Sequence, residues 1–146
     1  MKRGLEFMKT AVIYATKTKH SKKLAEAIAK DFNVEAKNIT ENPDIQDADL
    51  LFVVGGIYGG VSLPELSEYI QKAEAPLPKY AALVTSCASG SQKQTAVRAI
   101  LEQKGVKVID EFICRGGILF VYARHPNAED LKAAADFALR IIGETV

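Results

Sequence analysis

Hydrophobic residues along the chain alternate between short compact stretches and stripes with a helical spacing. The stretches are rich in apolar and β-branched residues and lie at Ala11–Ala15, Leu50–Val54, Ala81–Val84 and Val106–Cys114. The uninterrupted apolar runs Ala11–Ala15 and Leu50–Val54 are typical of strands buried on both faces of a parallel sheet. Val34–Lys37 is a weaker candidate for a short edge strand. The pattern therefore predicts five strands.

Between these strands, apolar residues recur every three or four positions, which predicts four helices. The stripes are Leu24, Ile28 and Phe32; Leu66, Ile70 and Ala73; Val97, Ile100 and Leu101; and Leu131, Ala135, Ala138 and Ile142. Helix-end signals accompany them. The first helix is expected over Lys22–Asp31, beginning near Ser21, and Ser62 with Glu65 forms a capping-box pattern before the second. Gly105 fits the position after the third helix, and Asn127 and Gly143 bracket the fourth.

Alternation of strands and helices predicts a doubly wound α/β fold, with a five-stranded parallel sheet and helices on both faces. In such sheets ligands bind beyond the carboxyl ends of the strands. Three strand ends here are followed by segments rich in Gly, Ser and Thr, which are Thr16–Ser21, Gly55–Gly60 and Thr85–Ser91. Parallel strands bring all three segments to one edge, which is the predicted site.

Length and composition narrow the class of protein. The chain has 146 residues, a formal charge of +1 and two cysteines. This favours a single domain over residues 9–146, with residues 1–8 as an N-terminal extension. The chain lacks the excess of positive charge that is typical of nucleic-acid binding, and it has no apolar run as long as a membrane span. The cysteines fit neither a metal site nor a disulfide framework. We therefore expect a cytoplasmic protein that binds neither nucleic acid nor membrane.

The first segment has the chemistry of an anion site. Thr16, Thr18 and Ser21 supply hydroxyl groups just before and within the start of a helix, where free N–H groups and the helix dipole favour a phosphate. Lys17, Lys19 and His20 lie beside the expected anion and are further candidate ligands. The hydroxyl residues alternatively cap the helix and close a turn.

Several phosphate-handling families are excluded by what the segments lack. There is no G-x-G-x-x-G after the first strand and no P-loop pattern. A receiver domain would need an Asp where Val54-Gly55 stands. A low-molecular-weight tyrosine phosphatase would need Cys and Arg in the first loop, and neither is present.

From about Lys9 to Ile142 the sequence resembles the flavodoxin family, with Thr16, Thr18 and Ser21 as its hydroxyl-rich first loop. Gly56-Ile57-Tyr58-Gly59 is similar to the family's second loop, an aromatic residue among glycines, and Ser86-Cys87-Ala88-Ser89-Gly90 to its third. Lys19 occupies the position where the family's first loop has glycine.

The resemblance implies a strand order of 2-1-3-4-5 and FMN as the cofactor. Its phosphate would lie on Thr16–Ser21, and its isoalloxazine ring between Ile57-Tyr58 and the Ser86–Gly90 segment. The implied function is electron transfer between redox partner proteins, a reductase and an acceptor. No general acid or base is visible, which favours a carrier.

Two alternatives stay open at this point. One is a flavin-dependent quinone or small-molecule reductase of the same fold, and the other is a non-redox module that has lost the cofactor, which Lys19 favours. Ile118–Tyr122 is an apolar run outside the expected core, and it is either packed over the sheet edge or a homodimer surface. Cys87 is interpreted as a packing residue at the site rather than a reactive thiol.

Overall fold

The computed structural model describes residues 9–15, 20–58, 61–62, 64–87, 94–115 and 128–145. Five parallel strands form its sheet in the order β2-β1-β3-β5-β6. They are β1 (Thr10–Ala15), β2 (Ala36–Asn38), β3 (Leu50–Tyr58), β5 (Tyr80–Cys87) and β6 (Lys107–Arg115). Because β5 and β6 are the fourth and fifth parallel strands, the predicted order 2-1-3-4-5 is confirmed.

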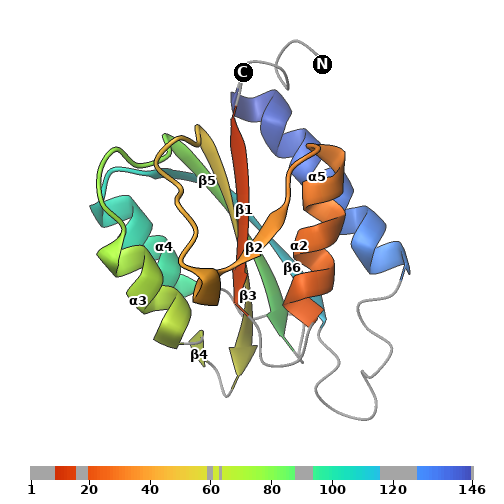
Figure 1. Ribbon diagram of the computed structural model, residues 1–146. Helices are drawn as coiled ribbons and strands as arrows, with labels where there is room; N and C mark the ends of the chain where they lie inside the picture. The colour runs from red at the N-terminus through yellow and green to blue at the C-terminus, as the bar shows by residue number, and fades with distance from the viewer. Residues whose placement is uncertain are drawn as a thin grey trace.

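Helices cover both faces of the sheet (Figure 1). On one face lie α2 (His20–Asp31) and α5 (Ala128–Thr145), and on the other lie α3 (Pro64–Lys72) and α4 (Thr95–Gln103). A 3₁₀ turn, η1 (Ile39–Glu41), follows β2, and a two-residue strand, β4 (Val61–Ser62), pairs antiparallel with the end of β3. The predicted doubly wound α/β fold is therefore confirmed.

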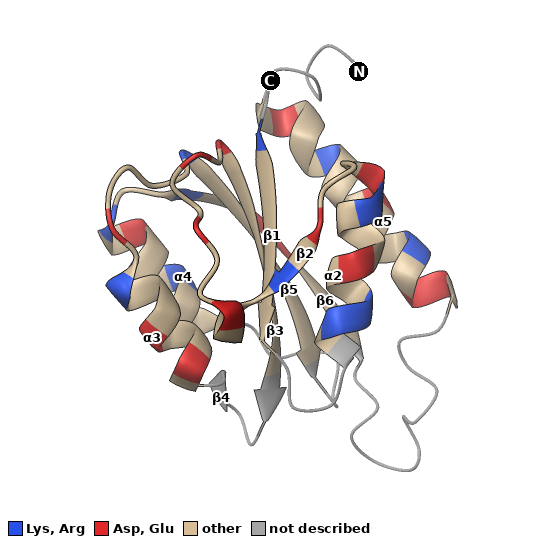
Figure 2. Cartoon of the chain, in the orientation of Figure 1, with Lys and Arg blue, Asp and Glu red and all other residues tan. Residues whose placement is uncertain are grey.

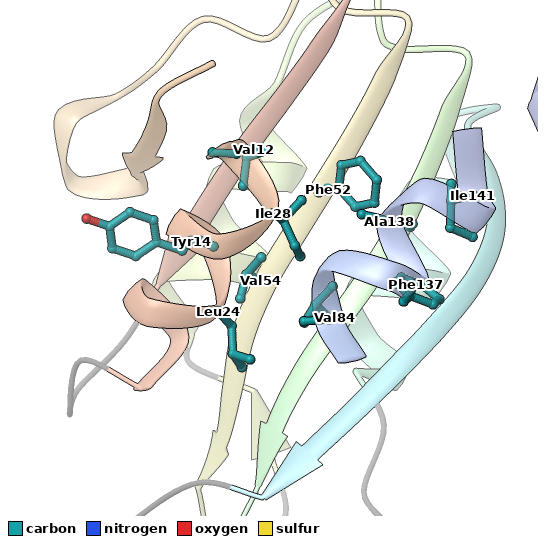
Figure 3. Close-up of a cluster of buried hydrophobic side chains, with 14 of the residues drawn as sticks. Val12, Tyr14, Leu24, Ile28, Phe52, Val54, Val84, Phe137, Ala138 and Ile141 are labelled. Carbon is teal, nitrogen blue, oxygen red and sulfur yellow. The ribbon is translucent and has the colours of Figure 1, made fainter. Parts of the chain in front are cut away.

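The sheet separates two apolar cores, since successive side chains of a strand point to opposite faces. Val12, Phe52 and Val84 face α2 and α5, where Ile28 and Phe137 meet them (Figure 3). Ile13, Val53, Leu83, Leu66 and Val97 belong to the second core, beneath α3 and α4. Every residue of Leu50–Val54 is fully buried, which is why this stretch reads as an unbroken apolar run.

Helix α4 ends as its sequence predicts. Gly105 has φ of +86°, its N–H donates to the carbonyl of Glu102, and the N–H of Val106 donates to the carbonyl of Leu101. This pair of bonds is the Schellman motif, which satisfies carbonyls that the helix leaves without partners.

Several predicted boundaries are wrong. Strand β3 does not stop at Val54 but continues through Gly55 and Gly56 to Tyr58, and β5 continues through Thr85 to Cys87. The reason is pairing between the two strands, which extends to Gly56 opposite Ser86 and Ile57 opposite Cys87. Tertiary pairing thus overrides the local loop signals of glycine and serine.

Two helix predictions also need correction. Ser62 lies in β4, and α3 begins at Pro64, so Ser62 does not occupy the N-cap position. Proline suits the first position of a helix because its missing N–H would have no partner there. Helix α5 continues through Gly143 to Thr145. Of its predicted stripe, Ala138 and Ile142 are buried and Leu131 packs against the same core, whereas Ala135 is only partly buried. The buried face also includes Ala134, Phe137 and Ile141. Asn127 lies outside the described residues.

Within the part of the chain that the structure describes, no helix combines the length and the apolar character that crossing a bilayer requires.

Candidate functional site

The three predicted site segments begin at one edge of the sheet, where the strands' carboxyl ends meet (Figure 1). Ala15, the last residue of β1, pairs with Gly55, while Gly56 pairs with Ser86 and Ile57 with Cys87. Strand β1 therefore ends three residues short of the end of β3. Helix α2 starts at His20, after the segment that follows β1. The ends of β1, β3 and β5, from which the three predicted segments begin, therefore lie side by side, as predicted.

Ser21 is the described residue that best marks the site. It is fully buried, it is the second residue of α2, and its Oγ has no hydrogen-bond partner among the described residues. A buried hydroxyl without a partner costs about 1–3 kcal/mol by mutational measures. An unsatisfied hydroxyl beside the free N–H groups of a helix start fits an acceptor group of a ligand.

The charge at the start of α2 differs from that of the other helices. Helices α3 and α5 carry acids in their first turns, and the carboxylate of Glu111 accepts from the backbone N–H of Gln94 at the start of α4, at 2.8 Å. Helix α2 has no acid in its first turn, and the next residues are the exposed Lys22 and Lys23 (Figure 2). Because a helix N-terminus is stabilised by negative charge, α2 suits an anion supplied from outside the chain.

The described starts of the second and third segments are paired strands, with Gly55–Ile57 of β3 opposite Thr85–Cys87 of β5. Gly56 and Ser86 are buried. Ile57 and Tyr58 pair with Ser62 and Val61 of β4, which leaves Gly59 and Gly60 between the two paired stretches. The side chains of Ile57, Tyr58 and Cys87 lie outside the described structure, so the stacking role of Tyr58 stays a prediction.

Other predicted residues also fall outside what the structure describes. They are Thr16, Lys17, Thr18, Lys19, Gly59, Ala88, Ser89 and Gly90, with the side chain of His20, residues 1–8 and the proposed homodimer segment Ile118–Tyr122. Cys114 is buried in the core beneath α2 and α5.

Sequence reasoning missed a buried polar cluster next to the site, made of Thr85, Gln94, Glu111 and Arg98. Gln94 and Thr85 are fully buried, and the Glu111 side chain is 2% exposed. The available signal was the pair of adjacent acids, Asp110 and Glu111, within a predicted strand, because a charge that is buried in a sheet needs partners.

Shifted pKa values also occur at Tyr69 and at Asp110, the chain neighbour of Glu111. Burial, and then the charge of Asp44, raises the pKa of Tyr69 on α3 to about 12, and its hydroxyl donates to the carbonyl of Pro43. The N–H of Glu111 donates to Asp110 and, with Arg140 at 2.9 Å, holds the pKa of that carboxyl below its usual value. Among the described residues, no group of His, Cys, Asp and Glu could hold a metal ion.

Comparison with known proteins agrees with this geometry. Residues 11–123 match the family model of a flavodoxin domain. The chain belongs to the flavodoxin family. An uncharacterized protein of Methanocaldococcus jannaschii is 30% identical to this flavodoxin-family chain over 150 residues, covering 92% of this chain and 99% of that protein.

Solved flavodoxin structures share the fold at low sequence identity. A WrbA-like flavodoxin of Agrobacterium tumefaciens matches with a TM-score of 0.72 at 15% identity, covering 93% of this chain and 96% of that one. A lysine-to-glycine mutant flavodoxin of Fusobacterium nucleatum, bound to flavin mononucleotide, matches with a TM-score of 0.66 at 15% identity, covering 95% and 98%. Both the predicted family and the predicted fold are thus confirmed.

Proposed function

We propose that this flavodoxin-family protein binds FMN and transfers electrons between redox partner proteins. The observation that carries the proposal is Ser21, whose buried Oγ has no partner among the described residues, at the start of a helix that lacks its own acid. A terminal phosphate supplies both missing elements, since it accepts hydrogen bonds and carries negative charge. FMN ends in such a phosphate, which makes it a better fit than a dinucleotide.

Family membership supports the same cofactor. The lysine-to-glycine mutant of the Fusobacterium nucleatum flavodoxin is bound to FMN, and so is a flavoprotein of Lactobacillus acidophilus that matches this fold with a TM-score of 0.52. The G-x-G-x-x-G fingerprint of dinucleotide-binding units is absent from this chain.

The proposal assigns roles to the three segments. Thr16, Thr18 and Ser21 donate hydrogen bonds to the phosphate, and Lys17 and Lys19 add positive charge beside it. The isoalloxazine ring lies between Ile57-Tyr58 and Ser86–Gly90, at the carboxyl ends of β3 and β5. When bound, FMN supplies the one- or two-electron chemistry, and the protein binds and orients the ring.

The test of the proposal is a titration of the purified, flavin-free protein with FMN, FAD and NADH, in which binding is followed by the fluorescence of each ligand. We expect FMN to bind most tightly and the loaded protein to show a flavin absorption spectrum. Equal or tighter binding of FAD would overturn the assignment of FMN, and no flavin binding at all would favour a module that has lost its cofactor.

Catalytic turnover with NAD(P)H and a quinone distinguishes an electron carrier from a reductase. A carrier needs a separate reductase, so the FMN-loaded protein alone should not couple NAD(P)H oxidation to quinone reduction. Steady NAD(P)H-dependent reduction of a quinone by the pure protein would instead identify an FMN-dependent reductase.

A further inference from the structure

A carboxylate is buried inside the sheet next to the proposed flavin site. Glu111 lies in β6, and its side chain is 2% exposed. The pairing of β6 with β5 shifts register between Ala81 and Leu83, which inserts one extra residue into β6. Because of this bulge, Ile109 and Asp110 both face α5, and Glu111 turns toward α4.

One oxygen of Glu111 joins the two ends of the β5–α4 connection. Its Oε2 accepts from Thr85 Oγ1 at 2.5 Å and from the backbone N–H of Gln94 at 2.8 Å. Thr85 lies near the end of β5, and Gln94 immediately precedes α4. Arg98 approaches the other oxygen at 3.6 Å and balances the charge.

The side chain of Gln94 extends this cluster to β3. It is fully buried, and its Nε2 donates to the carbonyl of Val84 at 3.0 Å and to Thr85 Oγ1 at 3.1 Å. A longer contact of 3.4 Å reaches the carbonyl of Val53. Gln94 Oε1 also lies against Gly55, where an added Cβ would be 3.2 Å away. The cluster therefore contacts β3 and β5 just before both strands enter the proposed ring site.

We propose that Glu111 is a positioning residue of the flavin site, which fixes the ends of the β5–α4 connection and thereby the geometry around the flavin ring. This inference rests on the proposed function. A charged group that is buried and bonded to both ends of one connection holds those ends at a fixed separation, because breaking either bond leaves a buried charge poorly satisfied. In the proposal the phosphate end of the cofactor lies at α2 and contacts none of these residues. Changes at Glu111 should therefore affect the binding of the ring and not that of the phosphate.

The experiment compares Glu111→Gln and Thr85→Val with the parent by dissociation constants for FMN and riboflavin. Each change should weaken the binding of both ligands by about the same factor, roughly tenfold, which corresponds to about 1.4 kcal/mol of binding free energy. The visible circular dichroism of the saturated proteins should change as well, since it reports on the surroundings of the ring. Thr85→Ser keeps the hydroxyl and should retain parental binding.

Thr10→Val is the matched control. Thr10 Oγ1 is also buried in the sheet, but it has no hydrogen-bond partner among the described residues and lies at the amino end of β1. This variant should bind both flavins as the parent does. Should Glu111→Gln fail to fold, Thr85→Val carries the test alone, with urea unfolding of each variant as the stability reference.

Other outcomes overturn the inference. They are unchanged flavin binding in a folded Thr85→Val variant, a loss confined to FMN, or an equal loss in Thr10→Val. A parent protein that binds neither flavin overturns the proposed function and this inference with it, whereas a parent that binds FMN beside unaffected variants overturns the inference only.

Discussion

Replacing Gly55 by alanine tests the packing of β3 where it approaches the proposed site. A Cβ at this position would lie 2.7 Å from Leu66 Cδ2 and 3.2 Å from Gln94 Oε1. Leu66 and Gln94 are both fully buried, so neither has free space to move into. Forcing an extra methyl group into such a core costs about 1–3 kcal/mol. Removing a glycine from a strand returns about 0.5–1 kcal/mol. The middle of each range gives an expected net loss of about 1 kcal/mol.

Urea unfolding followed by far-UV circular dichroism measures this loss. The control is Gly143→Ala in α5, where an added Cβ meets nothing within 4 Å and the residue is exposed. That change should stabilise the protein, by up to about 1 kcal/mol, because alanine is the better helix former. Both substitutions replace glycine by alanine, yet they should change the free energy of unfolding in opposite directions.

A double-mutant cycle assigns the clash to its partner. Leu66→Ala alone should cost about 2–5 kcal/mol. In the Leu66→Ala background the new methyl group has room, so Gly55→Ala should become neutral or slightly stabilising, a coupling of at least about 1 kcal/mol. A Gly55→Ala variant as stable as the parent, or one with the same cost in both backgrounds, would refute the packing that we describe.

Three further predictions concern single side chains. Ser21→Ala should stabilise the flavin-free protein by about 1 kcal/mol, since it removes a buried hydroxyl without a partner. The same change should weaken FMN binding about tenfold and leave riboflavin binding unchanged. A flavin-free variant less stable than the parent would contradict this prediction. Tyr58→Ala should weaken FMN several-fold and shift its visible spectrum, because a stacked aromatic ring contributes about 1 kcal/mol; parental affinity and spectrum would exclude stacking. The raised pKa of Tyr69 stabilises the fold fully below pH 10, and this contribution is lost as pH rises through about 12. The urea unfolding midpoint should therefore fall more over that pH range for the parent than for Tyr69→Phe. Equal falls for the two proteins would show that Tyr69 is not shielded from solvent.

The inner strands and the site edge could be predicted from sequence because their signals are local. Leu50–Val54 is apolar at every position, since helices cover both faces of the sheet there. Leu24 and Ile28 lie on one face of α2 at helical spacing and are both fully buried. Once the strands are parallel, the segments that follow them must meet at one edge.

The strand ends and the Glu111 cluster could not be predicted in this way because they depend on long-range pairing. Gly56 and Ser86 are turn-forming residues by local preference, and it is their pairing with each other that keeps them in strands. Glu111 contacts Gln94 and Thr85, which are 17 and 26 residues away, and it faces them only because of a bulge. In α5, the alanines at 134, 135 and 138 fit several helix faces, and the large Phe137 and Ile141 determine which one is buried.

The dissociation constants of the parent protein for FMN and riboflavin test the central claim most directly, because the two ligands differ only in the phosphate. If Ser21 and its neighbours bind that phosphate, charge-assisted hydrogen bonds of about 1.5–3 kcal/mol each act on FMN alone. Two such bonds predict at least about a hundredfold preference for FMN, at about 1.4 kcal/mol per factor of ten. Equal affinity for FMN and riboflavin would show that the start of α2 is not a phosphate site and would contradict the proposed function.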